Sequence, residues 1–529
     1  MFKILMTYDS VEGLEGLLKN KDFKVEIHPK PSPEEFEKLI KEYDGLLIRS
    51  EVKVTANIIK AADKLKFIGR AGTGVDNVDK NAATQKGIVV ANVPGGNTIS
   101  AAEHTIGLML SMARNIPQAY ESLKSKKWDR KNFTGTELFG KYLGLIGLGR
   151  IGMEVAKRMQ AFGMKVIAYD PFANDSLAKS YEISLIPLDD VLINADYISI
   201  HSPLNDETRG MIDEKAISKM KDGVRIINCA RGPIVNEKDL AKAVKDGKVK
   251  AAALDVFAKE PPDDWTIIET DNVIATPHLA ASTEEAQIKI AKEMSEVIID
   301  FFTKGLIRNA VNVPTVDWET YKKMKPYIDL ASKVGLFCGQ MIEGGVKEVE
   351  VKYCGSLASV QTGTLTIAYL QGLLLPILNV KVNFVNAPLL AKERGIKIKE
   401  SKEADIQDYA GLIIAKVITD KGEWKVCATM FSDTNPRIVK INGLSVDVVP
   451  CGSVILIINE DKPGVVGNVG KVLGDSGVNI AGMSLGRKDI GGEALTIIEV
   501  DNTVSAEVIG KILAIGGIKK AKYIDLERD

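Results

Sequence analysis

Residues 142–152, YLGLIGLGRIG, decide the fold of the chain around them. A short apolar strand runs into Gly147-x-Gly149-x-x-Gly152, and a helical pattern, MEVAKRMQAFG, follows directly. The first glycine can make a tight turn, the second lets the backbone approach a pyrophosphate, and the third lets the helix pack closely on the strand. The helix N-terminus then offers free N–H groups to the phosphates. This stretch predicts a dinucleotide site.

The strand after this helix supports the prediction of a dinucleotide site. It reads KVIAY and ends at Asp170, 23 residues after Gly147, where a carboxylate meets the adenosine ribose 2′-OH. The charge of Asp170 would repel a 2′-phosphate, and Pro171-Phe172 supplies no arginine to receive one. The cofactor is therefore expected to be NAD. Chance spacing among 46 glycines is the alternative, but strand, glycines, helix and acid all fall in register.

Bulk composition limits the classes of function. A length of 529 residues suggests three or four domains, and a net charge of −1 argues against a nucleic-acid surface or a membrane-binding face. No window approaches 18 uninterrupted apolar residues. The five cysteines are scattered without metal-ligand spacing, so we predict reduced thiols, a cytoplasmic location and no metal site.

The N-terminal part, residues 1–98, alternates apolar runs with helical stretches. The runs FKILMTY, FKVEIHP, GLLIRS, LKFIGRAG and IVVANV are typical of buried parallel strands. A PGGN turn at 94–97 then opens a long apolar helix, where the chain is expected to enter a second domain. The pattern predicts an α/β domain in its own right.

The second domain, 99–282, holds the glycine motif. Strands recur at LGLIG, VIAYD, YISIHSP, RIINCAR, AAALDVF and NVIATPH, which predicts a doubly wound parallel sheet. From about residue 282 a long amphipathic helix follows with no strand after it. We expect this helix to return to the first domain, which would then be discontinuous, comprising 1–98 and 283–315.

The C-terminal part, from residue 316, no longer alternates strongly apolar strands with helices. Residues 346–353 and 411–418 alternate like half-exposed antiparallel strands, and Asp420-Lys421-Gly422 and Asn442-Gly443 are hairpin signals. These features predict an α+β domain with an antiparallel sheet over 316–451. Residues 452–529 follow the order strand, helix, strand, strand, helix, strand, which is the ferredoxin-like plan.

Strand ends of the second domain carry residues suited to hydride-transfer chemistry. Such an enzyme needs a proton carrier and a cation for the carbonyl. On position alone, His201 and His278 are the candidates for the carrier. A carboxylate such as Glu260 would favour the imidazolium of His278 and hold one tautomer, and Arg231 offers a two-pronged donor. Each alone is more often structural, but together they favour a catalytic site.

The first domain contributes cations at its own strand ends. Arg49 and Arg70 follow two of the strands, and the Gly72-Thr73-Gly74 loop could hold an anion through backbone N–H groups. Ligands of open α/β sheets lie beyond these ends, although a surface salt bridge is an equal alternative for either arginine. Asp255 could contact the nicotinamide amide, or solvent alone.

These motifs resemble a known family. LGLIGLGRIG, NCARGPIVNE, ALDVFAKEPP and TPHLAAST are similar to the D-isomer-specific 2-hydroxyacid dehydrogenases. LLIRSEVKVT, GRAGTGVDNVD and the two extra C-terminal domains narrow the resemblance to the long phosphoglycerate dehydrogenases. The resemblance implies that His278 is the proton donor, Glu260 its partner and Arg231 the substrate anchor, with His201 structural.

The resemblance also implies the other ligand contacts. Those to NAD would be Thr73, Gly147, Gly149, Arg150, Ile151, Gly152, Asp170, Ser202, Cys229, Asp255 and Ala281. Those to substrate would be Arg49, Arg70, Gly72, Thr73, Gly74 and Asn97. The implied reaction is NAD-dependent oxidation of 3-phospho-D-glycerate to 3-phosphohydroxypyruvate in L-serine biosynthesis, by a homo-oligomer expected to be a tetramer. A glyoxylate or hydroxypyruvate reductase and an NAD-sensing scaffold are the alternatives.

The last domain resembles the ACT fold, a small-molecule-sensing module. The resemblance implies L-serine binding through Asn459, Asp461 and Asn479 at a subunit interface. The alternative is that these residues only form a turn and a helix cap, as Asn and Asp often do. The 316–451 domain resembles the intervening domain of the same family, a further effector or anion site. Inhibition by L-serine is left open.

Overall fold

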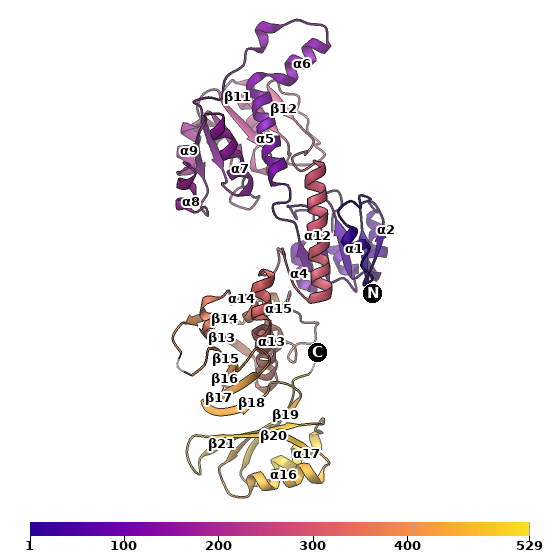
Figure 1. Cartoon of the computed structure of the whole chain (residues 1–529), viewed down its shortest axis with the longest axis vertical. Helices are drawn as coiled ribbons and strands as arrows, with labels where there is room; N and C mark the ends of the chain where they lie inside the picture. Colours follow the sequence, from indigo (N-terminus) through magenta and orange to yellow (C-terminus); the bar gives the residue numbers. More distant parts are fainter. Residues whose placement is uncertain (407, 528–529) are drawn as a thin grey trace.

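Four β-sheets follow one another along an elongated molecule (Figure 1). The computed structural model describes residues 1–406 and 408–527. The two α/β units occupy one half of the long axis, and the C-terminal unit lies at the opposite end from the sheet that holds the glycine motif (Figure 1). We call the four parts the N-terminal, Rossmann, intervening and ACT units.

The N-terminal unit has a five-stranded parallel sheet in the order β2-β1-β3-β4-β5. Strands β3 and β5 are buried along their length, because helices cover both faces of the sheet. The strands are β1 (Phe2–Met6), β2 (Phe23–Ile27), β3 (Gly45–Ile48), β4 (Phe67–Arg70) and β5 (Val89–Ala91), and the helices are α1 (Glu15–Leu18), α2 (Pro33–Leu39), η1 (Ile40–Glu42), α3 (Ala56–Ala61) and α4 (Lys80–Lys86).

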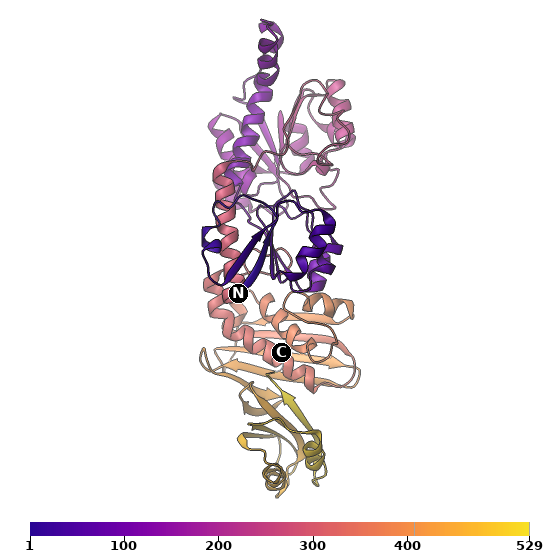
Figure 2. The ribbon, with the colours of Figure 1, turned by 90° about the vertical axis from the view of Figure 1, so that its right-hand side faces the viewer.

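A late helix completes this first unit. Helix α12 (Glu284–Lys304) runs beside the N-terminal sheet in both views, and its Met294 and Ile298 share a core with Ile4 (Figures 1 and 2). The ring of Phe302 lies 4.7 Å from that of Phe2. Farther on, Ala310 bridges to Ala91 at the end of β5. The predicted discontinuous α/β frame is confirmed.

The Rossmann unit has a seven-stranded parallel sheet in the order β12-β11-β10-β9-β6-β7-β8. Strand order reverses between β6 and β9, so a crevice opens at the carboxyl end of β6. The strands are β6 (Tyr142–Ile146), β7 (Lys165–Tyr169), β8 (Ser184–Leu185), β9 (Tyr197–Ile200), β10 (Val224–Asn228), β11 (Val249–Leu254) and β12 (Val273–Ala275). The helices are α5 (Thr98–Arg114), α6 (Ile116–Lys124), η2 (Arg130–Phe133), α7 (Arg150–Ala161), α8 (Asp175–Ser180), α9 (Leu188–Asn194), α10 (Glu214–Lys219), η3 (Gly232–Ile234) and α11 (Glu237–Lys245).

The sheet of the intervening unit differs from its prediction. This six-stranded sheet, in the order β14-β13-β15-β16-β17-β18, is mixed, because β13 and β14 run parallel. The sequence of β14, KIKESKE, is exposed throughout, so it carries no apolar alternation that would mark a strand. The strands are β13 (Val346–Gly355), β14 (Lys397–Glu403), β15 (Gly411–Thr419), β16 (Glu423–Met430), β17 (Pro436–Ile441) and β18 (Leu444–Val448).

Two helices pack tightly behind that sheet. Helix α13 (Trp318–Met341) was not predicted, and it meets α14 (Gly363–Leu374) at glycines. A Cβ on Gly335 would lie 2.1 Å from the carbonyl oxygen of Tyr369, so no larger residue fits at this crossing. The short elements η4 (Ser356–Ser359) and α15 (Ala387–Glu393) complete the unit.

The ACT unit has the predicted ferredoxin-like plan. Its antiparallel sheet has the order β20-β21-β19-β22, and α16 and α17 cover one face (Figure 1). The other face, including Leu456 and Ile497, joins the core of the intervening unit. The elements are β19 (Ser453–Glu460), α16 (Val465–Asp475), β20 (Ile480–Arg487), β21 (Glu493–Val500), α17 (Ala506–Leu513) and β22 (Ile518–Asp525). Among the described residues, no helix combines the length and apolarity needed to cross a bilayer.

Candidate active site

The carboxyl ends of the two parallel sheets face a cleft of about 830 Å³. Its N-terminal wall includes the predicted substrate residues Arg49, Arg70 and Gly72. Its Rossmann wall includes Glu260, His278 and Ala281. The structure therefore brings residues from both units to one cavity, as expected for ligands held beyond strand ends.

His278 and Glu260 form a hydrogen-bonded pair in this cleft. Nδ1 of His278 lies 2.7 Å from Oε2 of Glu260, and the Phe257 N–H donates to the other oxygen at 3.0 Å. Burial raises the pKa of Glu260, but the bonds from His278 and Phe257 outweigh it, and the net shift is downward. Glu260 is thus ionised near neutrality. The imidazole is 41% exposed, and the described residues give its Nε2 no protein partner.

Asp255 fixes the loop that carries His278. This carboxylate is fully buried after β11 and accepts the N–H groups of Leu279 at 2.7 Å and Ala280 at 2.9 Å. Burial raises the pKa of Asp255, but hydrogen bonds from His104, Thr276 and these amides bring it below its ordinary value. The loop is held where His278 has φ 57°, a backbone conformation that residues other than glycine rarely adopt. A contact between Asp255 and the nicotinamide stays a prediction.

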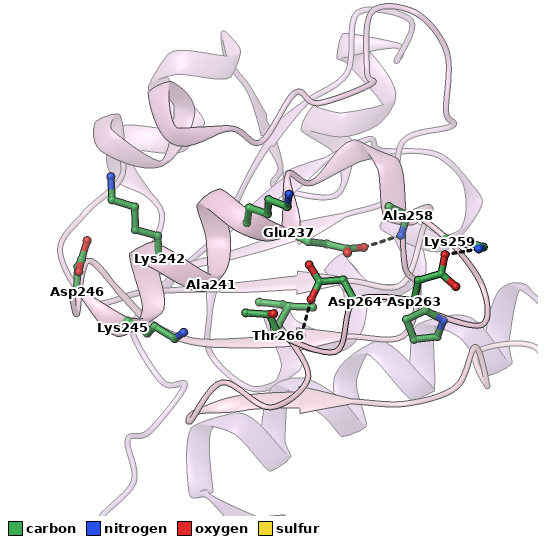
Figure 3. A pocket seen from close by; sticks show the side chains of 13 residues that line it. Glu237, Ala241, Lys242, Lys245, Asp246, Ala258, Lys259, Asp263, Asp264 and Thr266 are labelled. Atoms are coloured by element: carbon green, nitrogen blue, oxygen red, sulfur yellow. Dashed lines mark hydrogen bonds and ion pairs between the residues drawn. The ribbon is translucent and has the colours of Figure 1, made fainter.

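The loop that carries Glu260 is held from the other side. Glu237, the first residue of α11, accepts the N–H of Ala258 at 2.5 Å (Figure 3). A Cβ on Gly232 would lie 1.9 Å from the carbonyl carbon of Phe257, so the turn after Arg231 and the Glu260 loop are in direct backbone contact. The pocket of about 530 Å³ drawn in Figure 3 lies along α11, and none of the predicted site residues lines it.

Arg231 of the Rossmann unit contacts the N-terminal unit. Its Nε donates to Oδ2 of Asp76 at 2.9 Å, and Nη1 donates to the carbonyl of Ala230 at 2.7 Å. Nη2 lies against the anion loop, because a Cβ on Gly74 would sit 2.0 Å from it. Buried Asn228 holds the turn, donating to the Arg231 carbonyl and accepting the Ala230 N–H, both at 3.0 Å. Neither Asp76 nor Asn228 was predicted as a site residue.

Two further guanidinium groups line the N-terminal wall. Arg70 has a buried Nε without a hydrogen-bond partner among the described residues. Burial, with repulsion from Arg231 and Arg49, lowers the pKa of Arg70 to about 10. Arg49 stacks over Tyr8 at 4.6 Å and donates to Gln287 at 3.0 Å. Cations this close favour a ligand with more than one negative charge.

The anion loop is anchored to the connection between the units. The hydroxyl of Thr73 donates to Oδ1 of Asn97 at 2.7 Å, and the buried amide of Asn92 donates to the Thr73 carbonyl. Asn97 immediately precedes α5, where the chain crosses into the Rossmann unit. Sequence reasoning placed Thr73 and Asn97 at the site but missed Asn92, an ordinary strand-end residue.

The glycine motif forms a cradle that fits a dinucleotide. Gly147 has φ 98°, and a Cβ there would lie 2.8 Å from the backbone of Ser202, whereas one on Gly149 would meet open space. A Cβ on Gly152 would lie 2.3 Å from the Gly147 carbonyl oxygen. Helix α7 begins at Arg150 without a side-chain cap, so its first N–H groups are free for phosphate. Asp170 accepts the Leu148 N–H at 2.8 Å, which places its carboxylate beside the cradle.

The remaining predicted cofactor residues surround this cradle or lie beside it. The Arg150 side chain lies against Gly95, Ile151 packs on the core beneath, and Ser202 donates to the Ile146 carbonyl at 3.1 Å. Burial raises the pKa of Cys229 to about 12, so it is a thiol at neutral pH.

His201 differs from His278 in its surroundings. Its Nε2 lies 2.9 Å from the hydroxyl of Ser199, and burial lowers the pKa of His201 to about 4. A histidine that is neutral throughout the physiological range cannot exchange protons readily there. This environment agrees with the structural role that the family resemblance implies for His201.

The three predicted effector residues lie in the ACT unit and have partners within the chain. Asn459 is 2% exposed and accepts the hydroxyl of Thr496 at 3.1 Å. Asp461 pairs with Arg487 at 2.6 Å, and Asn479 donates to a carboxylate oxygen of Asp501 at 2.6 Å. None of the three is among the residues that line the cleft or the pocket along α11, and their role stays a prediction.

Comparison with known proteins places the whole chain in a family. Residues 106–280 match the D-isomer specific 2-hydroxyacid dehydrogenase NAD binding domain, 323–442 the D-3-phosphoglycerate dehydrogenase intervening domain, and 453–517 the ACT domain. The D-3-phosphoglycerate dehydrogenase of Archaeoglobus fulgidus is 45% identical over 98% of this chain and 98% of its own. That of Methanocaldococcus jannaschii is 44% identical over 99% of this chain and all of its own.

The chain belongs to the D-3-phosphoglycerate dehydrogenase family. The predicted fold class, enzyme class and cofactor are confirmed: the chain is an NAD-dependent 2-hydroxyacid dehydrogenase. Among solved structures, the D-lactate dehydrogenase of Aquifex aeolicus, complexed with NAD and lactic acid, is 31% identical with a TM-score of 0.53. It covers 59% of this chain and 100% of its own, a share close to that of the two α/β units.

Proposed function

We propose that this enzyme oxidises 3-phospho-D-glycerate to 3-phosphohydroxypyruvate with NAD, the first committed step of L-serine biosynthesis. One observation carries the proposal: a His278–Glu260 pair faces a cleft lined by Arg49 and Arg70, and Arg231 lies close enough to Arg70 to lower the pKa of that guanidinium. A 2-hydroxy acid with a phosphate at its far end offers one hydroxyl, one carboxylate and one phosphate to these groups. Family membership supports the same substrate.

Each residue has one task in this proposal. Nε2 of His278 takes the hydroxyl proton, and Glu260, bound to the opposite ring nitrogen, stabilises the imidazolium that forms. Arg231 holds the carboxylate and the oxygen that becomes the carbonyl. Arg49, Arg70 and the Gly72–Gly74 backbone bind the phosphate end. NAD, when bound in the glycine cradle, supplies the hydride acceptor.

Initial rates distinguish this activity from glyoxylate reduction. The wild-type chain should oxidise 3-phosphoglycerate with NAD, and in reverse its kcat/KM for 3-phosphohydroxypyruvate should exceed that for glyoxylate by at least about 10³-fold. The reason is that glyoxylate leaves the phosphate-binding arginines without a partner. Equal efficiency with both acids would contradict the proposal and favour a glyoxylate reductase.

Replacing Glu260 with glutamine tests the histidine pair. An amide cannot stabilise an imidazolium as a carboxylate does, so the reverse reaction, which needs protonated His278, should slow by about 100-fold at neutral pH. Steady-state rates at neutral pH check this expectation, and a rate within about twofold of wild type would contradict it.

We infer that the protein is a homo-oligomer, and we propose a tetramer. Helix α6 projects from the Rossmann unit and has no buried residue (Figures 1 and 2). Ile116, Tyr120 and Leu123 on it are exposed, and Trp128 beyond it is 81% exposed. Such a contiguous apolar arm is typical of a subunit contact. Light scattering should give an oligomer that Trp128→Lys weakens, and a monomeric wild type would refute the inference.

We also propose that L-serine binds the ACT unit through Asn459, Asp461 and Asn479 at an interface between two copies. Their partners within the chain, such as Arg487, would have to be exchanged for the amino acid. Rates of 3-phosphoglycerate oxidation with and without L-serine test this. Inhibition in the wild type that Asp461→Ala removes would support it, and unchanged rates at millimolar serine would contradict it.

A cytoplasmic location is proposed from the cysteines. All five cysteines are free thiols, and three of them, Cys338, Cys354 and Cys427, are buried. Cell fractionation followed by immunoblotting tests this proposal, and recovery of the protein from a membrane or extracellular fraction would contradict it.

A further inference from the structure

Asp76 has no role in the reaction proposed above, yet it contacts a residue central to that reaction. We propose that Asp76 is a positioning residue that orients the guanidinium of Arg231 from the opposite wall of the cleft. The inference rests on the proposed function, in which Arg231 holds the substrate. It assigns to Asp76 the task of making Arg231 competent once the two α/β units come together.

Some N–H groups of Arg231 are hydrogen-bonded within the protein, and others are left for a ligand. Oδ2 of Asp76 takes Nε–H at 2.9 Å, and the Ala230 carbonyl takes one Nη1–H at 2.7 Å. These bonds fix the plane of the guanidinium at two points. Nη2 lies beside Gly74 and is used by neither of these two bonds. In the proposed reaction, its N–H groups are the ones left to bind the substrate carboxylate.

The contact also joins the two units. Asp76 belongs to the loop after β4, and Arg231 follows β10, 155 residues farther along the chain. Among the residues that the structure describes, this is the only ion pair between the N-terminal sheet and the Rossmann unit. Because the pair joins the two units, any movement that separates them would break it, and the orientation of Arg231 would then depend on closure. Substrate-driven closure and arginine alignment would be one event.

A purely stabilising role explains the pair poorly. The Asp76 side chain is 62% exposed and that of Arg231 is 32% exposed, and exposed pairs add little to folding stability. Nor does Asp76 attract the substrate. Its negative charge lies close to the arginines, where it raises the pKa of Arg70 against the larger effect of burial, and it would repel an anionic ligand. Alignment of Arg231 is the benefit that remains.

This combination predicts an unusual kinetic signature. In Asp76→Ala, kcat for 3-phosphoglycerate oxidation should fall by about tenfold or more, because Arg231 loses its orientation. The KM for 3-phosphoglycerate should not rise, because a charge that repels the substrate is removed as well. Asp76→Asn keeps an acceptor oxygen in place, so it should recover most of the lost kcat. A merely structural residue would not separate kcat from KM in this way.

Matched variants and two readouts keep the test decisive. Asp189→Asn removes an equally exposed carboxylate from the Lys219 pair on the outside of the Rossmann unit, and its kinetics should match the wild type. NADH affinity, measured by fluorescence, should be unchanged in all three variants. The inference would be overturned if kcat of Asp76→Ala stayed within about twofold of wild type, with or without a raised KM. It would also be overturned if Asp76→Asn did not recover the lost kcat. Wild type that fails to oxidise 3-phosphoglycerate would instead contradict the proposed function.

Discussion

Replacing His278 with alanine should lower kcat for 3-phosphoglycerate oxidation by about 10³-fold. The imidazole is the proton carrier of the proposed reaction, and its Nδ1 is already bound to Glu260 at 2.7 Å, which leaves Nε2 for the substrate. NADH binding should hardly change, because the glycine cradle lies on other strands of the sheet. Turnover and fluorescence titration of NADH measure the two effects separately.

His28 offers a matched control for this substitution. It follows β2 in the N-terminal unit, away from the residues that line the cleft. His28→Ala should therefore turn over at the wild-type rate. Normal turnover in His278→Ala would remove this histidine from the mechanism, whereas a lost affinity for NADH would mean that the substitution had disturbed the cofactor site instead.

The second large effect is expected at Arg231. Removing the guanidinium with alanine should reduce kcat/KM for 3-phosphoglycerate by about 10³-fold, the range seen when a donor to a developing oxyanion is lost. Lysine keeps the charge but not the planar fork, and it cannot donate to Asp76 and substrate in the same way. Arg231→Lys should therefore recover only part of the loss, with kcat more affected than KM.

A second arginine serves as the control for the loss of a positive charge outside the site. Arg209 lies exposed in a loop of the same unit and has no ion pair among the described residues. Arg209→Ala should leave kcat/KM unchanged. Full activity in Arg231→Ala would exclude the arginine as substrate anchor, and a fully active Arg231→Lys would show that a point charge is sufficient.

The sequence predicted those parts of the molecule that local patterns encode. Apolar runs predict buried parallel strands. Residues that directly follow such strands, such as His278 and Arg231, could therefore be placed at the same edge of one sheet. Helix α13 was missed because Pro326 and a run of lysines interrupt its apolar period. Strand β14 was missed because its polar side chains are all exposed, and only its pairing with β13 makes it a strand.

Contacts between distant parts of the chain were beyond such patterns. The hydrogen bond between Asp76 and Arg231 joins residues 155 positions apart, and the sequence around either residue does not indicate its partner. The buried amide of Asn228 likewise reveals its role only through the turn it holds.

The return of α12 to the first sheet has a consequence for synthesis. The N-terminal strands leave the ribosome early, but α12, whose Met294 and Ile298 cover one face of that sheet, begins about 190 residues after α5 starts. At ~5–20 residues per second, that face waits roughly 10–40 s for its cover. A fragment ending at residue 98 should consequently give no cooperative melting transition by circular dichroism. The segment that leaves the ribosome first therefore keeps one apolar face uncovered until α12 has been synthesised.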